Sequence, residues 1–249
     1  MGKLTGIIKL EGTFDGLTFY KSRDGYLVKT KSGVSKKRIM TDPAFARTRE
    51  NINEFGLNAQ AGTQLRNSIG PLLVRAKDSR LSSRLFQLMS QIKNYDSSSL
   101  RGLRRVHKGL ATTEGMLLLR GFDFNARAGL QTVLHAPYTL DTTTGSIVIT
   151  DFLPQQQLVW PEGASHVSLR SGFVNLDFET GVFDSSFSPV SQFSFTAAIS
   201  SLNLLPLAVP LGLGTQLYFF LIEFSQEVNG ISYALNNGAF NVLNLVEVL

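Results

Sequence analysis

Side chains that could catalyse a reaction or bind a metal are few in this chain. None of the three histidines, His107, His135 and His166, has a second His, Asp or Glu at a metal-binding spacing such as HxxxH or HxH. The lack of cysteine excludes disulfides, thiolate metal sites and cysteine nucleophiles. No GxSxG elbow, Walker-type phosphate loop or GxGxxG motif is present. We therefore predict a protein that is not an enzyme and that uses no metal or cofactor.

Charged residues are divided unequally between the two halves of the chain. Residues 36–109 contain 15 Lys and Arg against 5 Asp and Glu. Residues 1–112 carry a net charge of +13, and residues 113–249 carry −8. Such a division indicates either a polyanionic partner or docking of the basic half of one subunit on the acidic half of another.

Two helices are predicted in the basic stretch. Thr41-Asp42-Pro43 is typical of a helix start, with Asp as the N-cap and Pro in the first turn. A second helix is predicted over 71–93, where one face is apolar: Val74, Leu81, Leu85, Leu88 and Ile92. The neighbouring stripe contains Lys77, Arg80 and Arg84, together with Gln87 and Gln91. This stripe is either the solvated edge of a packed helix or a surface for phosphate or for carboxylates of a partner.

A compact basic group follows in the sequence LRGLRRVHKGL. Arg101, Arg104, Arg105 and Lys108 have the spacing of one helical face. Together with Lys77, Arg80 and Arg84, they are the candidate contact for a polyanion or a partner.

Strand patterns occur at the amino terminus and throughout the second half. A three-stranded meander is predicted at about 4–10, 17–22 and 26–31, with a hairpin turn at Asp24-Gly25. A sheet this small is marginal alone, so we expect it to pack on something else. Eight further strands are predicted, at 117–125, 130–136, 146–152, 165–178, 192–199, 215–228, 231–235 and 239–249.

These patterns predict an α+β protein. A basic region with a β-meander and helices, residues 1–112, precedes an antiparallel β-sandwich of the jelly-roll or immunoglobulin-like kind, residues 113–249. No helical crossovers separate the later strands, which argues against a parallel α/β fold.

An apolar segment broken by proline and glycine, SSLNLLPLAVPLGLGTQ, covers 200–216. It is too short and too interrupted to span a membrane, and we predict a long loop. Burial within its own subunit and contact with another subunit are both open. The candidate apolar interface is Leu204, Leu205, Leu207, Val209 and Leu211.

The amino terminus, MGKLTGIIKLEG, has no apolar run of signal-peptide length before charges return. We therefore expect synthesis in the cytoplasm, with the final location open.

Both ends of the chain have distinctive sequences. The start reads GKLTGIIKLEGTFDGLTFYKSRDGYLVKTKSG, followed by DPAFARTRENINEFG, and the end reads FFLIEFSQEVNGISYALNNGAFNVLNLVEVL. These stretches resemble the two ends of a family of uncharacterised bacterial proteins. The resemblance implies that the two halves form a unit, and it carries no activity, cofactor or catalytic residue.

Three functional hypotheses follow. The first is a non-enzymatic structural protein that assembles into a homo-oligomer or a larger shell or filament through its basic helical half and its apolar loop. The second is a protein that associates with nucleic acid without reading its sequence. The third is a β-sandwich that binds carbohydrate or another ligand, with Trp160 as the candidate platform. No small-molecule substrate is inferred.

Overall fold

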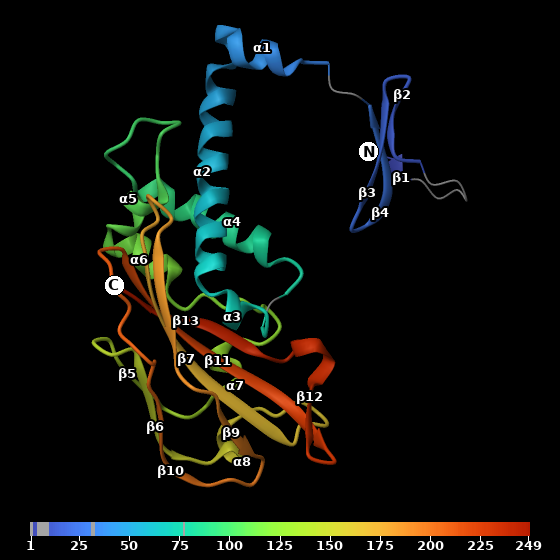
Figure 1. Cartoon of the computed structure of the whole chain (residues 1–249). Helices are drawn as coiled ribbons and strands as arrows, with labels where there is room; N and C mark the ends of the chain where they lie inside the picture. The colour runs from blue at the N-terminus through green and yellow to red at the C-terminus, as the bar shows by residue number, and fades with distance from the viewer. Residues whose placement is uncertain (1, 4–9, 31–32, 77) are drawn as a thin grey trace. The chain divides into compact units, whose positions relative to one another are not determined.

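The computed structural model describes residues 2–3, 10–30, 33–76 and 78–249 (Figure 1). The chain divides into two compact units, Met1–Asn51 and Ile52–Leu249, called here the amino-terminal and the carboxy-terminal unit. Helices and antiparallel sheets occur together, so the predicted α+β class is confirmed. No helix of the described residues is long and apolar enough to cross a membrane.

The amino-terminal unit begins with a small antiparallel sheet. Its strands are β1 (Gly2–Lys3), β2 (Gly12–Phe14), β3 (Leu17–Ser22) and β4 (Gly25–Thr30), in the order β1-β4-β3-β2. The strand expected at 17–22 and the hairpin to the next strand are confirmed. The strand expected at 4–10 lies almost wholly outside the described residues, and β2 was not expected. Asp15 and Gly16, with φ of 44° and 77°, form the tight turn between β2 and β3.

Two short helical segments follow the sheet, α1 (Lys36–Thr41) and the 3-10 turn η1 (Pro43–Phe45). The helix start predicted at Asp42-Pro43 is confirmed, because Asp42 Oδ1 accepts a hydrogen bond of 3.0 Å from the Ala44 amide. The long helix α2 (Ala46–Ser68) then runs from the first unit into the second.

The carboxy-terminal unit contains further short helices, which are α3 (Gly70–Leu73), α4 (Leu81–Ile92), η2 (Lys93–Tyr95), α5 (Val106–Leu110), α6 (Thr113–Leu119), α7 (Leu130–Val133), α8 (Pro154–Gln157) and η3 (Leu235–Gly238). The single helix expected over 71–93 is wrong, because the chain leaves α3 and re-enters a helix only at α4. Asp78 explains the interruption: its side chain accepts hydrogen bonds from the amides of Arg80, at 2.6 Å, and Ala126, at 3.0 Å. These bonds hold the chain in a turn before α4 starts.

Two of the predicted strands begin as helices instead. The segment expected as a strand at 117–125 begins inside α6, which Thr112 caps by accepting a hydrogen bond from the Gly115 amide. The segment expected at 130–136 begins with α7. Short apolar runs such as LLL do not by themselves distinguish a buried strand from a helix, and the N-cap at Thr112 decides the first case.

The central sheet of this unit is antiparallel and has six strands. These are β7 (His166–Leu176), β8 (Phe183–Phe187), β9 (Ser191–Ser194), β11 (Thr215–Val228), β12 (Ile231–Ala234) and β13 (Val242–Val248). The strand β11 pairs with β7 along the whole length of β7, from Thr215 opposite Leu176 to Ser225 opposite His166. The turn predicted at Asn229-Gly230 joins β11 to β12, with φ of 54° and 78°.

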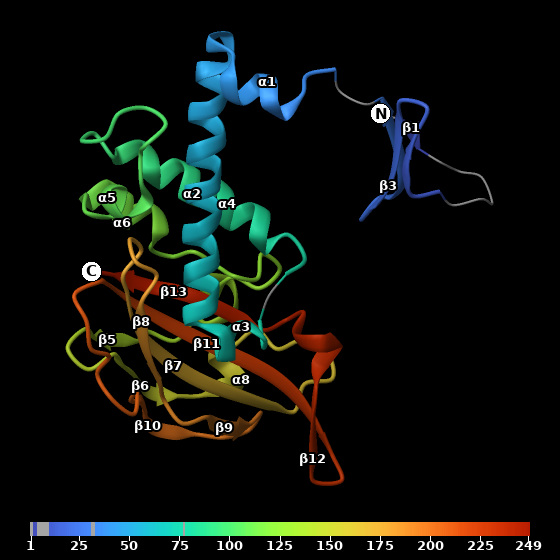
Figure 2. The same cartoon turned by 45° about the horizontal axis from the view of Figure 1, so that its top comes forward.

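Both faces of the central sheet are covered (Figures 1 and 2). On one face the helices pack against Leu217, Phe219 and Leu221 of β11. On the other face a three-stranded sheet, made of β5 (Thr139–Asp141), β6 (Ser146–Phe152) and β10 (Ile199–Leu204), packs against Phe220 and Ile222. This is the sandwich expected from the sequence, with helices added as a third layer. Burial on both faces explains why β11 is apolar without alternation.

The predicted domain boundary at 112/113 stays a prediction. In the structure, the helices before it and the strands after it share one hydrophobic core, which reaches from Ala61 in α2 to Val248 in β13.

Candidate interaction surfaces

The basic residues predicted to share one helical face do not lie on one helix. Arg101, Arg104 and Arg105 precede α5, and only Lys108 lies in it. The cause is Asp96, whose carboxylate accepts hydrogen bonds from the amides of Ser98, Ser99 and Arg105 and so folds 96–105 into a loop. Burial alone would raise the pKa of Asp96, but these hydrogen bonds outweigh it and hold the pKa well below its usual range.

Arg104 is bound to an internal carboxylate. Its Nε and Nη2 atoms donate to the two oxygens of Glu54 at 2.8 and 2.9 Å, and Glu54 has a side-chain exposure of only 5%. The Gly102 amide donates to the same carboxylate at 2.8 Å, and the Lys93 ammonium forms an ion pair with it. The Arg104 hydrogen bond, with help from Lys93 and Gly102 and against the effect of burial, lowers the pKa of Glu54 to about 2.

The stripe predicted on the second helix is also divided. Arg84 donates to the carbonyls of Asp123 at 2.8 Å and Phe124 at 3.0 Å, and it pairs with Asp78, so it ties α4 to the following loop. Lys77 lies outside the described residues. Arg80, at the start of α4, is exposed, as are Arg101, Arg105 and Lys108. A contact between these residues and a polyanion or a partner stays a prediction.

The apolar segment contains both a strand and an exposed surface. The prediction of a loop over all of 200–216 is wrong for its first part, which is β10. Leu204 ends this strand and is buried between the sheets, so it forms no surface. After it come exposed apolar side chains, which we call the apolar strip: Leu205, Leu207, Val209, Leu211 and Leu213.

The apolar strip is held in a fixed conformation. The amides of Ala208 and Leu211 donate to Ser186 Oγ at 2.9 Å and Asp184 Oδ2 at 2.8 Å, both on β8. The side chain of Asn175 on β7 donates to the Gly212 carbonyl and accepts from the amide of residue 214. These bonds keep the chain against the sheet and leave its leucines outside.

Proline and glycine between the leucines make this conformation possible. Pro206 and Pro210 are buried, so each turns its ring inward while the neighbouring leucines face outward. Gly212 has φ of 136°, where a side chain would be strained. At Gly214 a Cβ atom would lie 2.4 Å from the Leu176 carbonyl carbon. The prolines and glycines that exclude a membrane helix therefore also leave five apolar side chains exposed to solvent.

More exposed apolar surface adjoins the apolar strip. Val182 and Phe183, at the start of β8, are exposed and directly precede Asp184, which anchors Leu211. Leu207 and Leu211 are each 79% exposed. Covering a leucine side chain fully is worth about 1.5–3 kcal/mol, so a patch of this kind favours contact with another apolar surface.

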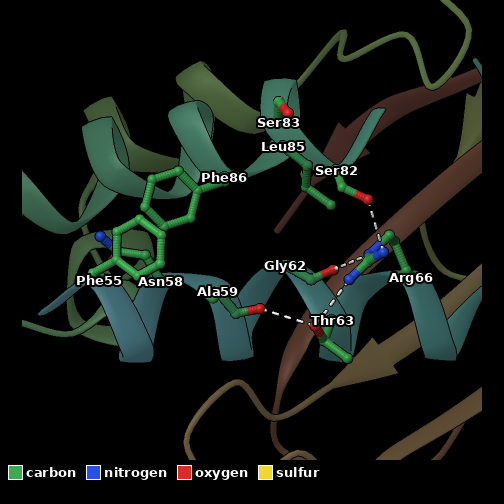
Figure 3. Close-up of a pocket in the computed structure, with 10 residues that line it drawn as sticks. All are labelled: Phe55, Asn58, Ala59, Gly62, Thr63, Arg66, Ser82, Ser83, Leu85 and Phe86. Atoms are coloured by element: carbon green, nitrogen blue, oxygen red, sulfur yellow. Dashed lines mark hydrogen bonds between the residues drawn. The ribbon is translucent and has the colours of Figure 1, made fainter. Parts of the chain in front are cut away.

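A groove of about 350 Å³ lies between α2 and α4 (Figure 3). The rings of Phe55 and Phe86 meet at one end, with centroids 4.4 Å apart. At the other end Arg66 donates to Ser82 Oγ at 3.0 Å and to Thr63 Oγ1 at 2.9 Å. The groove thus offers an apolar half and a polar half to whatever contacts it.

Asn58, beside this groove, contains an unpaired acceptor. Its Nδ2 donates to Ser90 Oγ at 3.1 Å, while its buried Oδ1 has no hydrogen-bond partner among the described residues. We expect Asn58→Leu to change the free energy of unfolding by less than about 0.5 kcal/mol, because removing the unsatisfied buried acceptor offsets the lost hydrogen bond to Ser90. Denaturant unfolding followed by tryptophan fluorescence measures it.

The matched control for that prediction is Asn53→Leu on the same helix. Asn53 Nδ2 donates to the Gly102 carbonyl at 2.6 Å, so this variant should lose about 1 kcal/mol. If Asn58→Leu were destabilised as much as Asn53→Leu, the unpaired acceptor would not be a cost to the fold.

His166 and the tryptophan have local roles in the structure. His166 accepts or donates a hydrogen bond of 2.9 Å with Ser165 Oγ, which is its neighbour in the chain, and Ser165 also accepts from the Glu227 amide. Trp160 donates to the Pro154 carbonyl at 2.7 Å and packs edge-on against two phenylalanines, so its ring belongs to the sandwich core. Among the described residues, no group of three or more His, Cys, Asp or Glu could hold a metal ion.

Comparison of the chain with protein-family models, with curated proteins and with solved structures gave no match.

Proposed function

We propose that this protein is a non-enzymatic structural protein that self-assembles, and that the apolar strip forms a contact between copies. The observation that carries the proposal is the combination of exposure and fixed backbone at 205–213. Because the strip is already ordered, a partner that covers it does not have to meet the entropic cost of ordering a loop.

The surroundings of the apolar strip favour a protein partner over a lipid surface. Residues 171–249 contain no Lys or Arg and six Asp and Glu. Asp184 lies directly beside the strip, and Asp177 lies near Leu213. Carboxylates at this position would be repelled by anionic lipid headgroups. Membrane-binding surfaces instead carry Lys and Arg next to their apolar side chains.

The test is the solution mass of the purified chain by light scattering, with the ultraviolet absorbance ratio recorded to detect co-purifying nucleic acid. We expect a mass that is a multiple of 27.4 kDa. The variant Leu207→Lys/Leu211→Lys should weaken self-association by about 100-fold or more, because two apolar side chains are lost from the contact.

The matched control is Leu100→Lys. Leu100 is also 79% exposed but lies in the loop before α5, away from 205–213 in the sequence, so this variant should keep the wild-type mass. A wild-type protein that stays at 27.4 kDa at the highest accessible concentration would contradict the proposal. So would a strip variant that assembles as well as the control.

A further inference from the structure

The small sheet of the amino-terminal unit has two chemically different faces. Residues directly opposite each other in the register share a face: Phe14 with Leu17, Phe19 with Val28, and Lys21 with Tyr26. Apart from Lys21 and Thr30, this face is apolar, and the rings of Phe14 and Phe19 lie 6.2 Å apart. The opposite face carries more polar side chains, among them Thr13, Thr18 and Lys29.

Within its own unit, none of the residues that the structure describes forms a layer over the apolar face. None of the described residues from 10 to 51 is buried, and Phe14 and Leu17 are exposed. A sheet becomes stable by packing one face on a second layer, and three or four short strands without such a layer are marginal. The amino-terminal sheet therefore presents an apolar surface that needs a partner.

Charged side chains located at the two apolar surfaces are opposite in sign. Lys21 lies on the apolar face of the sheet, opposite Tyr26. At the apolar strip, the Asp184 carboxylate binds the Leu211 amide and Asp177 lies near Leu213. An ammonium group on one surface and carboxylates on the other favour contact between the two surfaces, whereas two copies of the strip would bring carboxylates together.

We propose that the apolar face of β2, β3 and β4 in one copy docks on the apolar strip of the next copy, so that the chain assembles head to tail. The proposal rests on the self-assembly proposed above and specifies which surface meets the strip. A contact between two different surfaces gives a ring if the rotation between copies closes, and an open filament if it does not. Docking of the same two surfaces within one chain would leave a monomer and is an outcome of the test.

The experiment uses two full-length variants, each with one surface disabled. Phe14→Glu/Leu17→Glu disables the sheet, and Leu207→Lys/Leu211→Lys disables the strip. Each variant alone should stay monomeric. Mixed at equal concentration, the two should form a complex of twice the monomer mass, because one chain still supplies an intact strip and the other an intact sheet. Misfolding of the substituted sheet does not affect this result, since that chain contributes only its strip.

The matched control is Thr13→Glu/Thr18→Glu, which places the same charges on the opposite face of the same two strands. This variant should assemble like the wild type. Raising the salt concentration should reduce the mass of the wild-type assembly, because screening weakens attraction between unlike charges.

Three results would overturn the head-to-tail contact. The first is a sheet variant that still assembles while the strip variant does not, which would leave self-assembly in place with strip docked on strip. The second is a mixture that stays monomeric while the wild type assembles. The third is a monomeric wild type, which would overturn self-assembly as well.

Discussion

Replacing Glu54 by Ala is expected to lower the free energy of unfolding by about 3–5 kcal/mol, because it leaves buried cations without their carboxylate. Arg104 and Lys93 both pair with Glu54, and their side chains are only 26% and 11% exposed. The Gly102 amide would also lose its acceptor. The measurement is denaturant unfolding followed by the fluorescence of Trp160, the single tryptophan of the chain.

The control for this prediction is Glu50→Ala, one turn earlier on α2. Glu50 pairs with Arg47 at 2.9 Å, but the Arg47 side chain is 71% exposed. Exposed ion pairs contribute little, so this variant should lose less than about 1 kcal/mol. Equal losses for Glu50→Ala and Glu54→Ala would show that the buried network does not stabilise the fold.

The Glu54 network also predicts a pH dependence. The pKa of Glu54 is lowered from 4.5 to about 2 in the folded protein, so the Glu54 carboxylate binds a proton more readily in the unfolded chain than in the folded one. The stabilisation by the carboxylate is therefore complete above about pH 4.5 and is lost as the pH falls toward 2. In Glu54→Gln this contribution is absent, and the stability difference from the wild type should shrink as the pH is lowered through this window. If the difference in unfolding free energy between the wild type and Glu54→Gln stayed constant over this pH range, Glu54 would not be the group with the lowered pKa.

Replacing Gly109 by Ala is expected to cost about 3 kcal/mol or more, because there is no space for a methyl group. A Cβ atom at Gly109 would lie 2.1 Å from the Ile92 carbonyl oxygen at the end of α4. The obstacle is backbone, so the two helices would have to separate. Gly115 repeats the arrangement, since its Cβ would lie 2.0 Å from the Gly109 carbonyl oxygen.

Gly56→Ala is the matched control, because Gly56 is also a helical glycine. Nothing lies within 4 Å of its Cβ position. Alanine favours helix over glycine, so this variant should gain about 0.5–1 kcal/mol. The measurement is again denaturant unfolding of the full chain. A Gly109→Ala variant as stable as Gly56→Ala would mean that α4 and α5 do not approach each other as closely as described.

The strands and turns with local signals could be predicted from the sequence. The ranges of β3, β6 and β11 agree with their predicted ranges, because each is an apolar or β-branched run bounded by turn residues. Asn229-Gly230 forms the expected hairpin because these residues tolerate the positive φ that a tight turn requires. Asp42 caps its helix for an equally local reason, a hydrogen bond to an amide two residues later.

Partners distant in the sequence could not be predicted. The spacing of Arg101, Arg104, Arg105 and Lys108 fits one helical face. In the structure, however, the Arg105 amide binds Asp96 and the Arg104 side chain binds Glu54, so the chain forms a loop here. A carboxylate some fifty positions away has no signature in a local pattern. For the same reason Arg84, which fits a solvated stripe, is instead bound to two carbonyls about forty residues later.

Residues 200–216 show most clearly which properties follow from the sequence and which follow from the fold. Its composition determined that 200–216 cannot span a membrane, since proline and glycine interrupt a run that is already short. Composition did not distinguish Leu204 from Leu207, because both are leucines in the same run. The tertiary structure places Leu204 between two sheets and leaves Leu207 outside, since the hydrogen bonds from β7 and β8 fix the backbone beyond β10. Which leucines are available to a partner is therefore decided by the fold and not by the sequence pattern.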